Sequence, residues 1–510
     1  MNQTTKAQWA PYDSADFANV KYPYLKKVGV IDVGSNSVRL VVFDGAARSP
    51  AYFYNEKIMC ALGAGMARSG QLNPDGRKRA LAAIDRFVHL AKGMGVPKLT
   101  AVATAAVRDA VDGIEFCNEV LEKTGQKIWI IDGLEEARLS AQGVLLGWPG
   151  SYGLVCDIGG SSMELAEISG GHVGKRISSD LGPLKLLEIK GGQKARLRHI
   201  KETLHKMHDA LGPQHNRLFL VGGSWRALAR VDMLRRNYPL HVMHEYRMST
   251  ADIRDTIAYL GDHDHDQIRA QAGISASRMA LVPYAAEVLK RILSVFKPKD
   301  IALSSYGIRE GMLYEEMPQD MRDRDPLIEA CHFAEMKDAR IPGYGMHLFD
   351  FVKGLFPLAT DDFLRLIQAA CHLHDVSWRA HPDYRAEVCF DNATRANLGG
   401  LKHSERVWLG LALLHRYKNS RDGSPFADLF TLLNEKQLQS AEIIGKAMRL
   451  GAMLWISDDH MHAELTINRK RQKVILELSR DMMPLFGEVA QARFESLAKS
   501  LKLAPKVVIR

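Results

Sequence analysis

Strand-like and helix-like hydrophobic patterns alternate along the first part of the chain. An apolar run at 28–31 and alternating apolar positions at 38–42 predict two strands joined by a tight turn. Residues 75–94 carry apolar side chains at helical spacing, and 127–147 have the pattern of a strand, a glycine turn and a helix. This alternation favours an α/β fold.

The opening strand–turn–strand pattern recurs 125 residues later. When Asp32 is aligned with Asp157, Gly34 meets Gly159 and the alternating apolar positions of the second strand coincide. An internal repeat of a whole domain start predicts two topologically similar α/β domains with a cleft between them.

The character of the chain changes at 317–326, a polar, proline-bearing stretch. Beyond it the pattern is mainly helical, with one late hairpin expected at 463–478. The first residues are polar and resemble a mobile leader. We therefore divide the chain into a leader, two α/β domains and a helical C-terminal domain, at residues 1–24, 25–143, 144–318 and 319–510. The expected C-terminal helices are 327–339, 346–356, 361–375, 404–418 and 439–456.

Composition narrows the class of protein. The 510 residues are 46% hydrophobic and contain no apolar run near the roughly 18–20 residues of a membrane span, and we see no signal peptide. Six scattered cysteines fit free thiols in the cytoplasm. The net charge of +9 favours anionic partners, such as nucleic acid, nucleotides or inorganic polyphosphate, although it also fits simple solubility.

The two repeated turns have the residues of a phosphate-binding loop. Glycines let the backbone N–H groups approach an anion closely, and serine hydroxyls add further hydrogen bonds. The candidate phosphate-binding residues are Gly34, Ser35, Asn36 and Ser37 in the first loop, and Gly159, Gly160, Ser161 and Ser162 in the second.

Each loop follows an aspartate at the end of an apolar strand. Asp32 and Asp157 are therefore candidate Mg²⁺ ligands, and Glu164 joins them if the turn folds it back. We expect the metal beside the second loop, because only this loop has the additional acid.

Other interpretations of the loops differ in what they require. The chain has no GxxxxGK[ST] motif, which argues against a P-loop. A dinucleotide-binding loop opens a helix, whereas both loops here open a second strand. Tight hairpins without a ligand remain the alternative, and the matched aspartates disfavour it.

Six segments resemble, in order, the successive motifs of the exopolyphosphatase/guanosine-pentaphosphate phosphatase family, in its long form. They are VGVIDVGSNSVRLVVFD, TAAVRDA, DGLEEARLSAQGV, CDIGGSSMELAEI, VGGSWRALA and YGIREGML, and together they cover about residues 25–320. The resemblance implies two ribonuclease-H-like domains of the actin-like ATPase superfamily around a cleft. One departure is Ser161, where the family usually has a glycine.

The resemblance also implies an activity and its requirements. We expect release of terminal orthophosphate from polyphosphate or from pppGpp, assisted by Mg²⁺ with or without a monovalent cation. It further implies a homodimer, and we expect no membrane association and no specific nucleic-acid partner.

Two residue roles follow from the resemblance. Glu136 matches the catalytic glutamate, which would act as base for in-line attack by water, and Arg108 matches an arginine beside the phosphate site. Taken without the family, an acid in the first turn of a helix only complements its dipole, and Arg108 is an ordinary surface arginine.

Two glycine-containing turns occur later in the second domain. Gly222, Gly223 and Ser224 follow a strand and open a helix, so we expect them to line the substrate cleft. Gly307 and 309–311 are expected to pack the last helix of the domain, a structural role.

The C-terminal region contains a His–Asp pair of the kind found in metal-dependent HD phosphohydrolases. His374 and Asp375, with His347 and Asp458, are a candidate second metal site, and the long forms of the family carry an HD-like region here. A buried histidine without a metal is the alternative. Seven basic residues nearby are either a solvated face or a track that guides polyphosphate: Arg379, Arg385, Lys402, His403, Arg406, Arg416 and Lys418.

The leading functional hypothesis is therefore an exopolyphosphatase. A pppGpp 5′-phosphohydrolase is the alternative enzyme, and a non-catalytic protein that binds polyphosphate or nucleotide and regulates a partner is the alternative from another class. In a further alternative, the HD-like region supplies the main activity.

Overall fold

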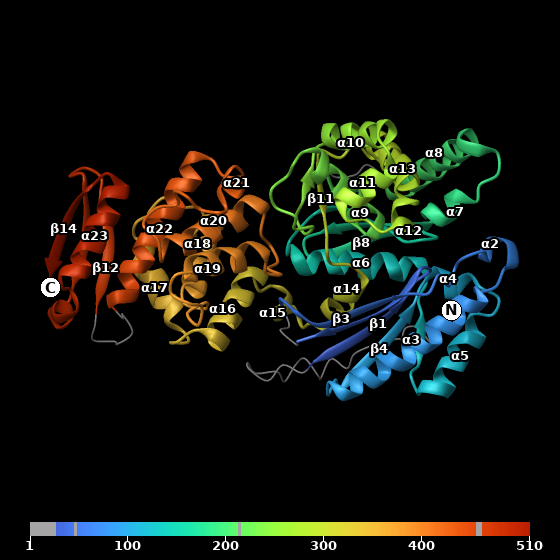
Figure 1. Ribbon diagram of the computed structural model, residues 1–510, viewed down its shortest axis with the longest axis horizontal. Coiled ribbons are helices and arrows are strands. Elements are labelled where there is room, and N and C mark those ends of the chain that lie inside the picture. Colours follow the sequence, from blue (N-terminus) through green and yellow to red (C-terminus); the bar gives the residue numbers. More distant parts are fainter. Residues whose placement is uncertain (1–26, 45–47, 213–215, 455–461) are drawn as a thin grey trace. The chain divides into compact units, whose positions relative to one another are not determined.

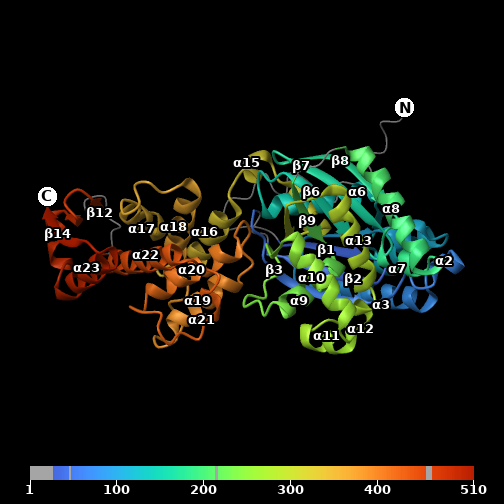
Figure 2. The ribbon, with the colours of Figure 1, turned by 90° about the horizontal axis from the view of Figure 1, so that it is seen from above.

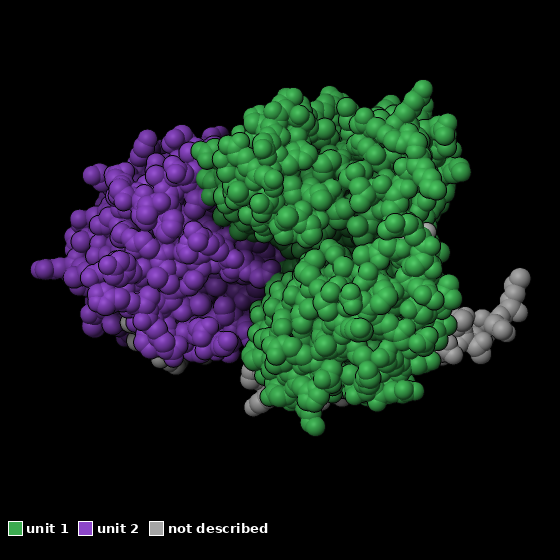
Figure 3. Space-filling view, turned by 45° about the vertical axis from the view of Figure 1, so that its right-hand side comes forward, with its two compact units in different colours: residues 1–326 green, residues 327–510 purple. Residues whose placement is uncertain are grey.

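The computed structural model describes residues 27–44, 48–212, 216–454 and 462–510 (Figure 1). Contacts divide the chain into two compact units, residues 1–326 and 327–510 (Figure 3). The predicted leader at 1–24 and the candidate ligand Asp458 lie outside the described residues.

Unit 1 begins with a five-stranded sheet in the order β3-β2-β1-β4-β5. Its strands are β1 (Val28–Val33), β2 (Ser37–Phe43), β3 (Tyr52–Met59), β4 (Lys98–Ala103) and β5 (Ile128–Ile130). Strand β1 pairs antiparallel with β2 and parallel with β4. The accompanying helices are α2 (Met66–Ser69), α3 (Pro74–Gly93), α4 (Ala105–Asp109), α5 (Gly113–Thr124) and α6 (Gly133–Gly147).

A second sheet of six strands follows, in the order β10-β11-β9-β6-β7-β8. Its strands are β6 (Gly153–Ile158), β7 (Met163–Ser169), β8 (His172–Ser179), β9 (Arg217–Val221), β10 (Arg247–Met248) and β11 (Asp300–Leu303). The helices are α7 (Pro183–Leu187), α8 (Gly192–Leu211), α9 (Gly223–Arg235), α10 (Thr250–Asp262), α11 (His265–Ala272), α12 (Ala276–Met279), α13 (Val282–Phe296), α14 (Ile308–Glu316) and α15 (Gln319–Arg322).

The repeat seen in the sequence is a repeated hairpin. The amide of Gly34 donates to the carbonyl of Ser37 at 3.0 Å, and the amide of Gly159 donates to the carbonyl of Ser162 at the same distance. Each turn joins the first two antiparallel strands of its sheet, β1–β2 and β6–β7. The two loops therefore have the same backbone turn, as the alignment predicts.

Helices α6 and α14 lie between the two sheets (Figure 1). One hydrophobic cluster contains Val30 of the first sheet, Val155 of the second, and residues of both helices. The outer faces pack on α3 and α5 in the first domain and on α8, α9 and α13 in the second. Because side chains alternate along a strand, Asp32 and Asp157 face this middle layer, as Val30 and Val155 do.

Glycines let α6 and α14 approach closely. A Cβ on Gly311 would lie 1.8 Å from the carbonyl oxygen of Leu139, and one on Gly143 would lie 2.3 Å from the carbonyl oxygen of Gly307. Any side chain at these positions would force the helices apart, so Gly311 has a packing role, as predicted.

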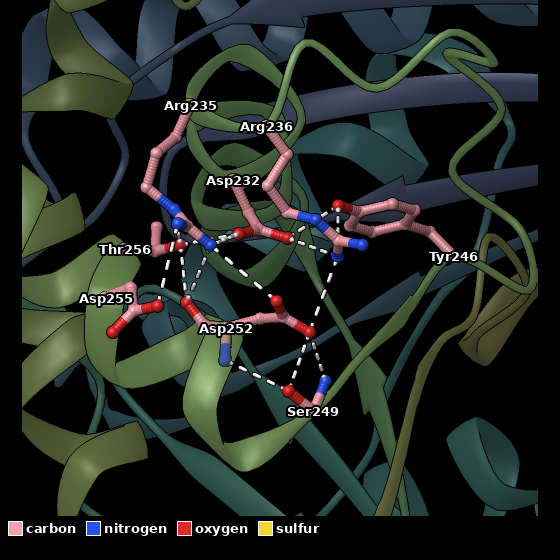
Figure 4. A network of polar contacts seen from close by, with 8 residues as sticks. All are labelled: Asp232, Arg235, Arg236, Tyr246, Ser249, Asp252, Asp255 and Thr256. Carbon is pink, nitrogen blue, oxygen red and sulfur yellow. Dashed lines mark hydrogen bonds and ion pairs between the residues drawn. The ribbon is translucent and has the colours of Figure 1, made fainter.

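A buried carboxylate fixes α9 against α10 (Figure 4). Asp232 is fully buried and accepts hydrogen bonds from the hydroxyls of Tyr246 at 2.5 Å and Thr256 at 2.7 Å. The guanidinium groups of Arg235 and Arg236 also contact it, at 2.9 and 3.4 Å. This network holds in place the helix whose N-terminus reaches the candidate site.

Unit 2 is mainly helical, with a small sheet. Its helices are α16 (Pro326–Asp338), α17 (Tyr344–Lys353), α18 (Asp361–Leu373), α19 (Arg385–Arg395), α20 (His403–His415), α21 (Ala427–Phe430), α22 (Glu435–Leu454), η2 (Arg480–Leu485) and α23 (Glu488–Leu501). The strands are β12 (Ala463–Asn468), β13 (Lys473–Leu478) and β14 (Ala504–Ile509). In both ribbon views the strands and α23 gather at the end of the unit to which α22 leads (Figures 1 and 2).

The predicted helical region and its hairpin are present, but the region is not purely helical. Strand β14 pairs parallel with β13 and completes a three-stranded sheet that the sequence pattern did not predict. All six cysteines are free thiols, as expected. Within the described residues, no helix is both long and apolar enough to span a bilayer.

Candidate active site

A cavity of about 500 Å³ opens in unit 1 among residues of both sheets. Twelve predicted site residues line it: Asp32, Gly34, Ser35, Asn36, Ser37, Glu136, Asp157, Gly159, Gly160, Ser162, Gly222 and Gly223. The other four predicted residues of this unit do not line it. These are Arg108, Ser161, Glu164 and Ser224, and each contacts a lining residue, a neighbouring loop or a cation of the cavity, as described below.

The first loop is held by the segment that follows β3. The amides of Cys60 and Ala61 both donate to the carbonyl of Asn36 at 3.0 Å, and the amide of Gly63 donates to the carbonyl of Ser35 at 2.8 Å. With its carbonyls bound in this way, the loop has a fixed backbone at the edge of the cavity.

The second loop is held by the first turn of α7 and by Gly182, the residue before it. The amide of Leu184 donates to the carbonyl of Gly160 at 2.8 Å, and a Cβ on Gly182 would lie 2.2 Å from the carbonyl carbon of Ser161. Ser161 is buried, and its hydroxyl lies 3.2 Å from that of Ser35. The residue that departs from the family therefore links the two loops.

Glu136 is presented by the first turns of α6. The carboxylate of Asp132 caps this helix by accepting the amide of Glu135 at 2.7 Å. Glu136 is only 5% exposed, and its Oε2 atom has no hydrogen-bond partner among the described residues. Arg108 lies 3.5 Å from that oxygen and donates to the carbonyl of Ile131 at 3.1 Å. Arg108 therefore orients the carboxylate and is held by it.

Asp157 and Glu164 face each other directly across the antiparallel pair β6–β7. Both are buried. The hydroxyl of Ser140, one turn after Glu136 on α6, donates to Asp157, and that of Ser178 donates to Glu164 at 2.9 Å. The two serines were not predicted, and they fix the carboxylates against neighbouring elements.

Burial and crowding raise the pKa values of these acids. Burial, and then the charges of Glu164 and Asp157, raise the pKa of Glu136 well above its usual range. Burial and the Asp157 charge raise the pKa of Glu164 to about 8, against the hydroxyl bonds that lower it. Burial also raises the pKa of Asp157 and of Asp32. Such mutual repulsion is relieved when a cation binds between the carboxylates.

The residues present fit a hard divalent cation. Mg²⁺ takes oxygen ligands, and Asp32, Asp157 and Glu164 supply buried carboxylates: the Asp32 charge raises the pKa of Asp157, and the Asp157 charge raises the pKa of Glu164. The Oε2 atom of Glu164 is buried without a hydrogen-bond partner among the described residues. Buried anionic oxygens without partners are costly unless a cation satisfies them.

Six basic side chains that the sequence did not indicate as ligands also line the cavity. They are Arg39, Lys57, Arg226, Arg230, Arg278 and Arg309. Burial and the charges of Arg278 and Arg39 lower the pKa of Lys57 to about 8. Burial and the charge of Arg309 lower the pKa of Arg39 to about 10. Positive side chains that lower one another's pKa values in this way are suited to binding an anion with several charges.

Arg309 corrects an expectation. Its segment was expected to be only structural, but its guanidinium lines the cavity and lies 4.0 Å from the Asp32 carboxylate. It is 7% exposed, and its Nη1 atom has no hydrogen-bond partner among the described residues. The same motif therefore combines a packing glycine, Gly311, with a cation of the site.

The N-terminus of α9 forms another edge of the cavity. Gly222 has a φ of 116°, and a Cβ there would lie 2.5 Å from the carbonyl oxygen of Ile158. Ser224 is buried, and its hydroxyl accepts a hydrogen bond from Arg278 at 3.4 Å. Ser224 therefore orients a cation of the cavity.

Among the described residues, His347, His374 and Asp375 do not form the predicted ligand cluster. Arg340 donates to both carboxylate oxygens of Asp375, at 2.5 and 2.8 Å. His374 is buried and donates from Nδ1 to the carbonyl of Cys371 at 2.7 Å, whereas His347 is exposed on α17. Burial and the charge of Arg416 lower the pKa of His374 to about 4. Arg340 thus binds the Asp375 carboxylate, which the motif predicts as a metal ligand.

The seven basic residues of the possible track differ in exposure: Arg379, Lys402 and Lys418 are exposed, whereas His403 and Arg406 are buried. Arg406 is 1% exposed and donates to the carbonyls of Ala396 and Leu398. Lys418 pairs with Glu387, and Arg385 donates to the carbonyl of Trp378 at 2.7 Å. Because two of the seven are buried and Lys418 is paired with an acid, the seven residues do not all belong to one surface.

Family models match both units of the chain. The model of the Ppx/GppA phosphatase family matches residues 41–320. A second model, described as exopolyphosphatase, C-terminal, matches residues 327–506.

Two curated relatives differ in their described roles. Retrograde regulation protein 2 of Saccharomyces cerevisiae is 23% identical over 448 residues, which cover 76% of this chain and 72% of the yeast protein. Exopolyphosphatase 1 of Mycobacterium tuberculosis is 26% identical over 318 residues, which cover 60% of this chain and 92% of that protein.

Solved structures share the fold of unit 1. A crystal structure of an exopolyphosphatase from Cytophaga hutchinsonii aligns with a TM-score of 0.52 at 23% identity, covering 57% of this chain and 97% of that one. A Ppx/GppA family member from Aquifex aeolicus aligns with a TM-score of 0.50 at 23% identity, covering 57% of this chain and 98% of that one. The predicted fold class is confirmed.

Proposed function

Because this chain belongs to the Ppx/GppA phosphatase family, we propose that it is an exopolyphosphatase. In this proposal, water attacks the terminal phosphorus of inorganic polyphosphate, the P–O bond to the rest of the chain breaks, and orthophosphate leaves. The shortened polyphosphate keeps the bridging oxygen.

The observation that carries the proposal is one cavity that combines buried acids, two glycine–serine loops and six basic side chains. The acids suit a metal and a base, whereas the loops and cations suit phosphate oxygens. A single phosphate group does not need six cations. A substrate with several consecutive phosphates would use the metal held by the acids and the six basic side chains at the same time.

Glu136 is the base in this mechanism. It lines the cavity, and its raised pKa gives the ionised carboxylate enough basicity to accept a proton from the attacking water. Arg108, 3.5 Å away, stabilises that ionised form and holds its orientation. The water's proton passes to Glu136 as the new P–O bond forms.

The charge that develops on the transferred phosphoryl group is stabilised by fixed groups. Residues of the two loops and Arg309 line the cavity, where free loop amides, serine hydroxyls and the guanidinium would donate to phosphate oxygens. When bound by Asp157 and Glu164, with Asp32 across the cavity, Mg²⁺ would neutralise phosphate oxygens.

A regulatory function is the second candidate. The yeast relative is named a retrograde regulation protein, and its similarity extends over 76% of this chain. In this alternative the same cavity binds polyphosphate or a nucleotide without cleaving it.

One set of measurements separates these functions. Phosphate release should be measured from long-chain polyphosphate and from pppGpp in the presence of Mg²⁺, together with direct binding of polyphosphate. We expect faster release from polyphosphate. Faster release from pppGpp would favour the alternative enzyme, and binding without any release would favour the regulator.

A further inference from the structure

Two histidines and a glutamate, none of them part of the His374–Asp375 pair, meet inside unit 2. His332 and Glu335 lie on α16, and His372 lies on α18. Their potential ligand atoms are within 4.8 Å of one another. The Nδ1 atom of His372 is 2.5 Å from Oε2 of Glu335, and Nδ1 of His332 is 3.9 Å from the same oxygen.

Glu335 is a buried anion with a fixed orientation. It is fully buried, and its Oε1 atom accepts the amide of Gly345, in the first turn of α17, at 2.6 Å. Burial alone would raise its pKa, but bonds with His332, His372 and this amide lower the pKa of Glu335 to about 2. The bond to the amide turns the other oxygen, Oε2, towards the two imidazoles.

The opposite side of His372 also has a polar neighbour. Its Nε2 atom lies 3.5 Å from the side-chain amide of Gln368, one turn earlier on α18. The amide nitrogen of Gln368 is the nearer atom. With the amide turned over, its oxygen would accept a hydrogen bond from Nε2–H, and the Nδ1 lone pair would then face the cluster. A second partner of this kind fixes the ring orientation of metal-binding histidines.

Gly345 makes room for the cluster. A Cβ at this position would lie 2.9 Å from Oε1 of Glu335 and 2.9 Å from Nδ1 of His372. His372 is 2% exposed, whereas the side chain of His332 is 43% exposed. The cluster is therefore closed by backbone on one side and reaches solvent through His332.

We propose that His332, Glu335 and His372 bind one divalent transition-metal ion of the zinc class. Two imidazoles and a carboxylate, with water in the fourth position, are a common zinc ligand set. With bonds of about 2.0–2.1 Å, tetrahedral ligand atoms lie roughly 3.3 Å apart. The observed 2.5 and 3.9 Å lie on either side of that separation, so small side-chain movements suffice.

The bound ion would join the three helices that begin unit 2. Glu335 already links α16 to α17 through the Gly345 amide, and His372 brings in α18. In the absence of an ion, a proton shared between His372 and Glu335 performs part of this role. The shared proton does not involve His332. Replacing His332 therefore distinguishes a bound metal ion from a shared proton.

Zinc binding to the full chain tests the proposal. Equilibrium dialysis against ⁶⁵Zn²⁺ should be done with excess Mg²⁺, which occupies sites made of carboxylates alone. We expect the wild type to bind one Zn²⁺ per chain. In His332→Ala we expect the affinity for Zn²⁺ to be weakened by about tenfold or more. His347→Ala, which removes an exposed histidine of α17, is the matched control and should bind as the wild type does.

Two further readouts keep the test decisive. Circular dichroism shows whether each variant folds, and Co²⁺ bound to the wild-type protein should give the absorption bands of a tetrahedral site with imidazole ligands. Gly345→Ala should weaken Zn²⁺ binding without removing any ligand. Equal zinc binding by the wild type and His332→Ala would overturn the proposal, as would an octahedral cobalt spectrum.

Discussion

Asp157 on β6 lies directly opposite Glu164 on β7, and both carboxylates are buried. Like charges at directly opposite positions of a sheet destabilise it. At the equivalent position of the first hairpin, Asp32 lies opposite Arg39. The repeated hairpin therefore carries an acid pair in one copy and an acid–base pair in the other, and for this reason we propose that the cation binds beside the second loop.

The acid pair should make stability depend on pH. The folded pKa of Glu164 is raised to about 8, so its stabilising protonation is complete below its usual pKa of 4.5 and is lost as pH rises through about 8. Without divalent cations, we expect the free energy of unfolding of the wild type, measured by thermal unfolding, to fall by on the order of a few kcal/mol over this range. Glu164→Gln should have a flatter profile, and Mg²⁺ should flatten that of the wild type. Glu167→Gln, on the same strand, is the control, and parallel profiles for all three proteins would contradict this account.

The basic side chains should determine substrate affinity. Arg278 lines the cavity and is oriented by Ser224. Replacing it with alanine removes charge-assisted hydrogen bonds to phosphate, so we expect KM for polyphosphate to rise roughly tenfold or more with a smaller change in kcat. Steady-state kinetics at two salt concentrations measure this, and the variant should be less sensitive to salt. Arg198→Ala, an exposed arginine of α8, should leave KM unchanged. Equal effects of the two substitutions would exclude a specific role for Arg278.

The hydroxyls of Ser35 and Ser161 should be coupled energetically. They are buried and lie 3.2 Å apart, one on each loop. We expect Ser35→Ala and Ser161→Gly to show a coupling of about 0.5–1.5 kcal/mol in a double-mutant cycle of the apparent free energy of unfolding. Additive effects would mean that the two loops are not joined through this contact.

The sequence predicts the parts of this site whose residues are close together in the chain. It does not predict the parts whose residues come from distant segments. Each loop is a contiguous segment, so its glycines, its serines and the preceding aspartate can be recognised without knowledge of the fold. The cations come from β2, β3, α9, α12 and α14, and only folding brings them together. One signal was available, because Arg39 occupies in the first repeat the position of Glu164 in the second.

The same reason explains the incorrect expectations. The pair His374–Asp375 has the residue types of a metal site, but the pattern does not reveal Arg340, which lies 35 residues earlier and binds the carboxylate. Strand β14 is short and its pairing with β13 is long-range, so no local hydrophobic period indicates it.

The network around Asp232 should contribute to the stability of unit 1. Asp232→Ala leaves the hydroxyl of Tyr246 and two arginines without their buried carboxylate, so we expect a loss of about 3 kcal/mol or more. Asp255→Ala is the matched control, because Asp255 contacts Arg235 at 3.7 Å but is 64% exposed. Urea denaturation of both variants measures the difference. Similar losses would show that the buried carboxylate has no special weight.

The central claim is that Glu136 activates the attacking water. The most direct measurement is kcat for phosphate release from saturating long-chain polyphosphate by Glu136→Gln, with Glu135→Gln as control. Glu135 is the adjacent acid and pairs with Arg138 at 2.5 Å. We expect kcat to fall about 10²–10⁴-fold in Glu136→Gln, with polyphosphate binding retained, and to change little in Glu135→Gln. Full activity in Glu136→Gln would contradict the account.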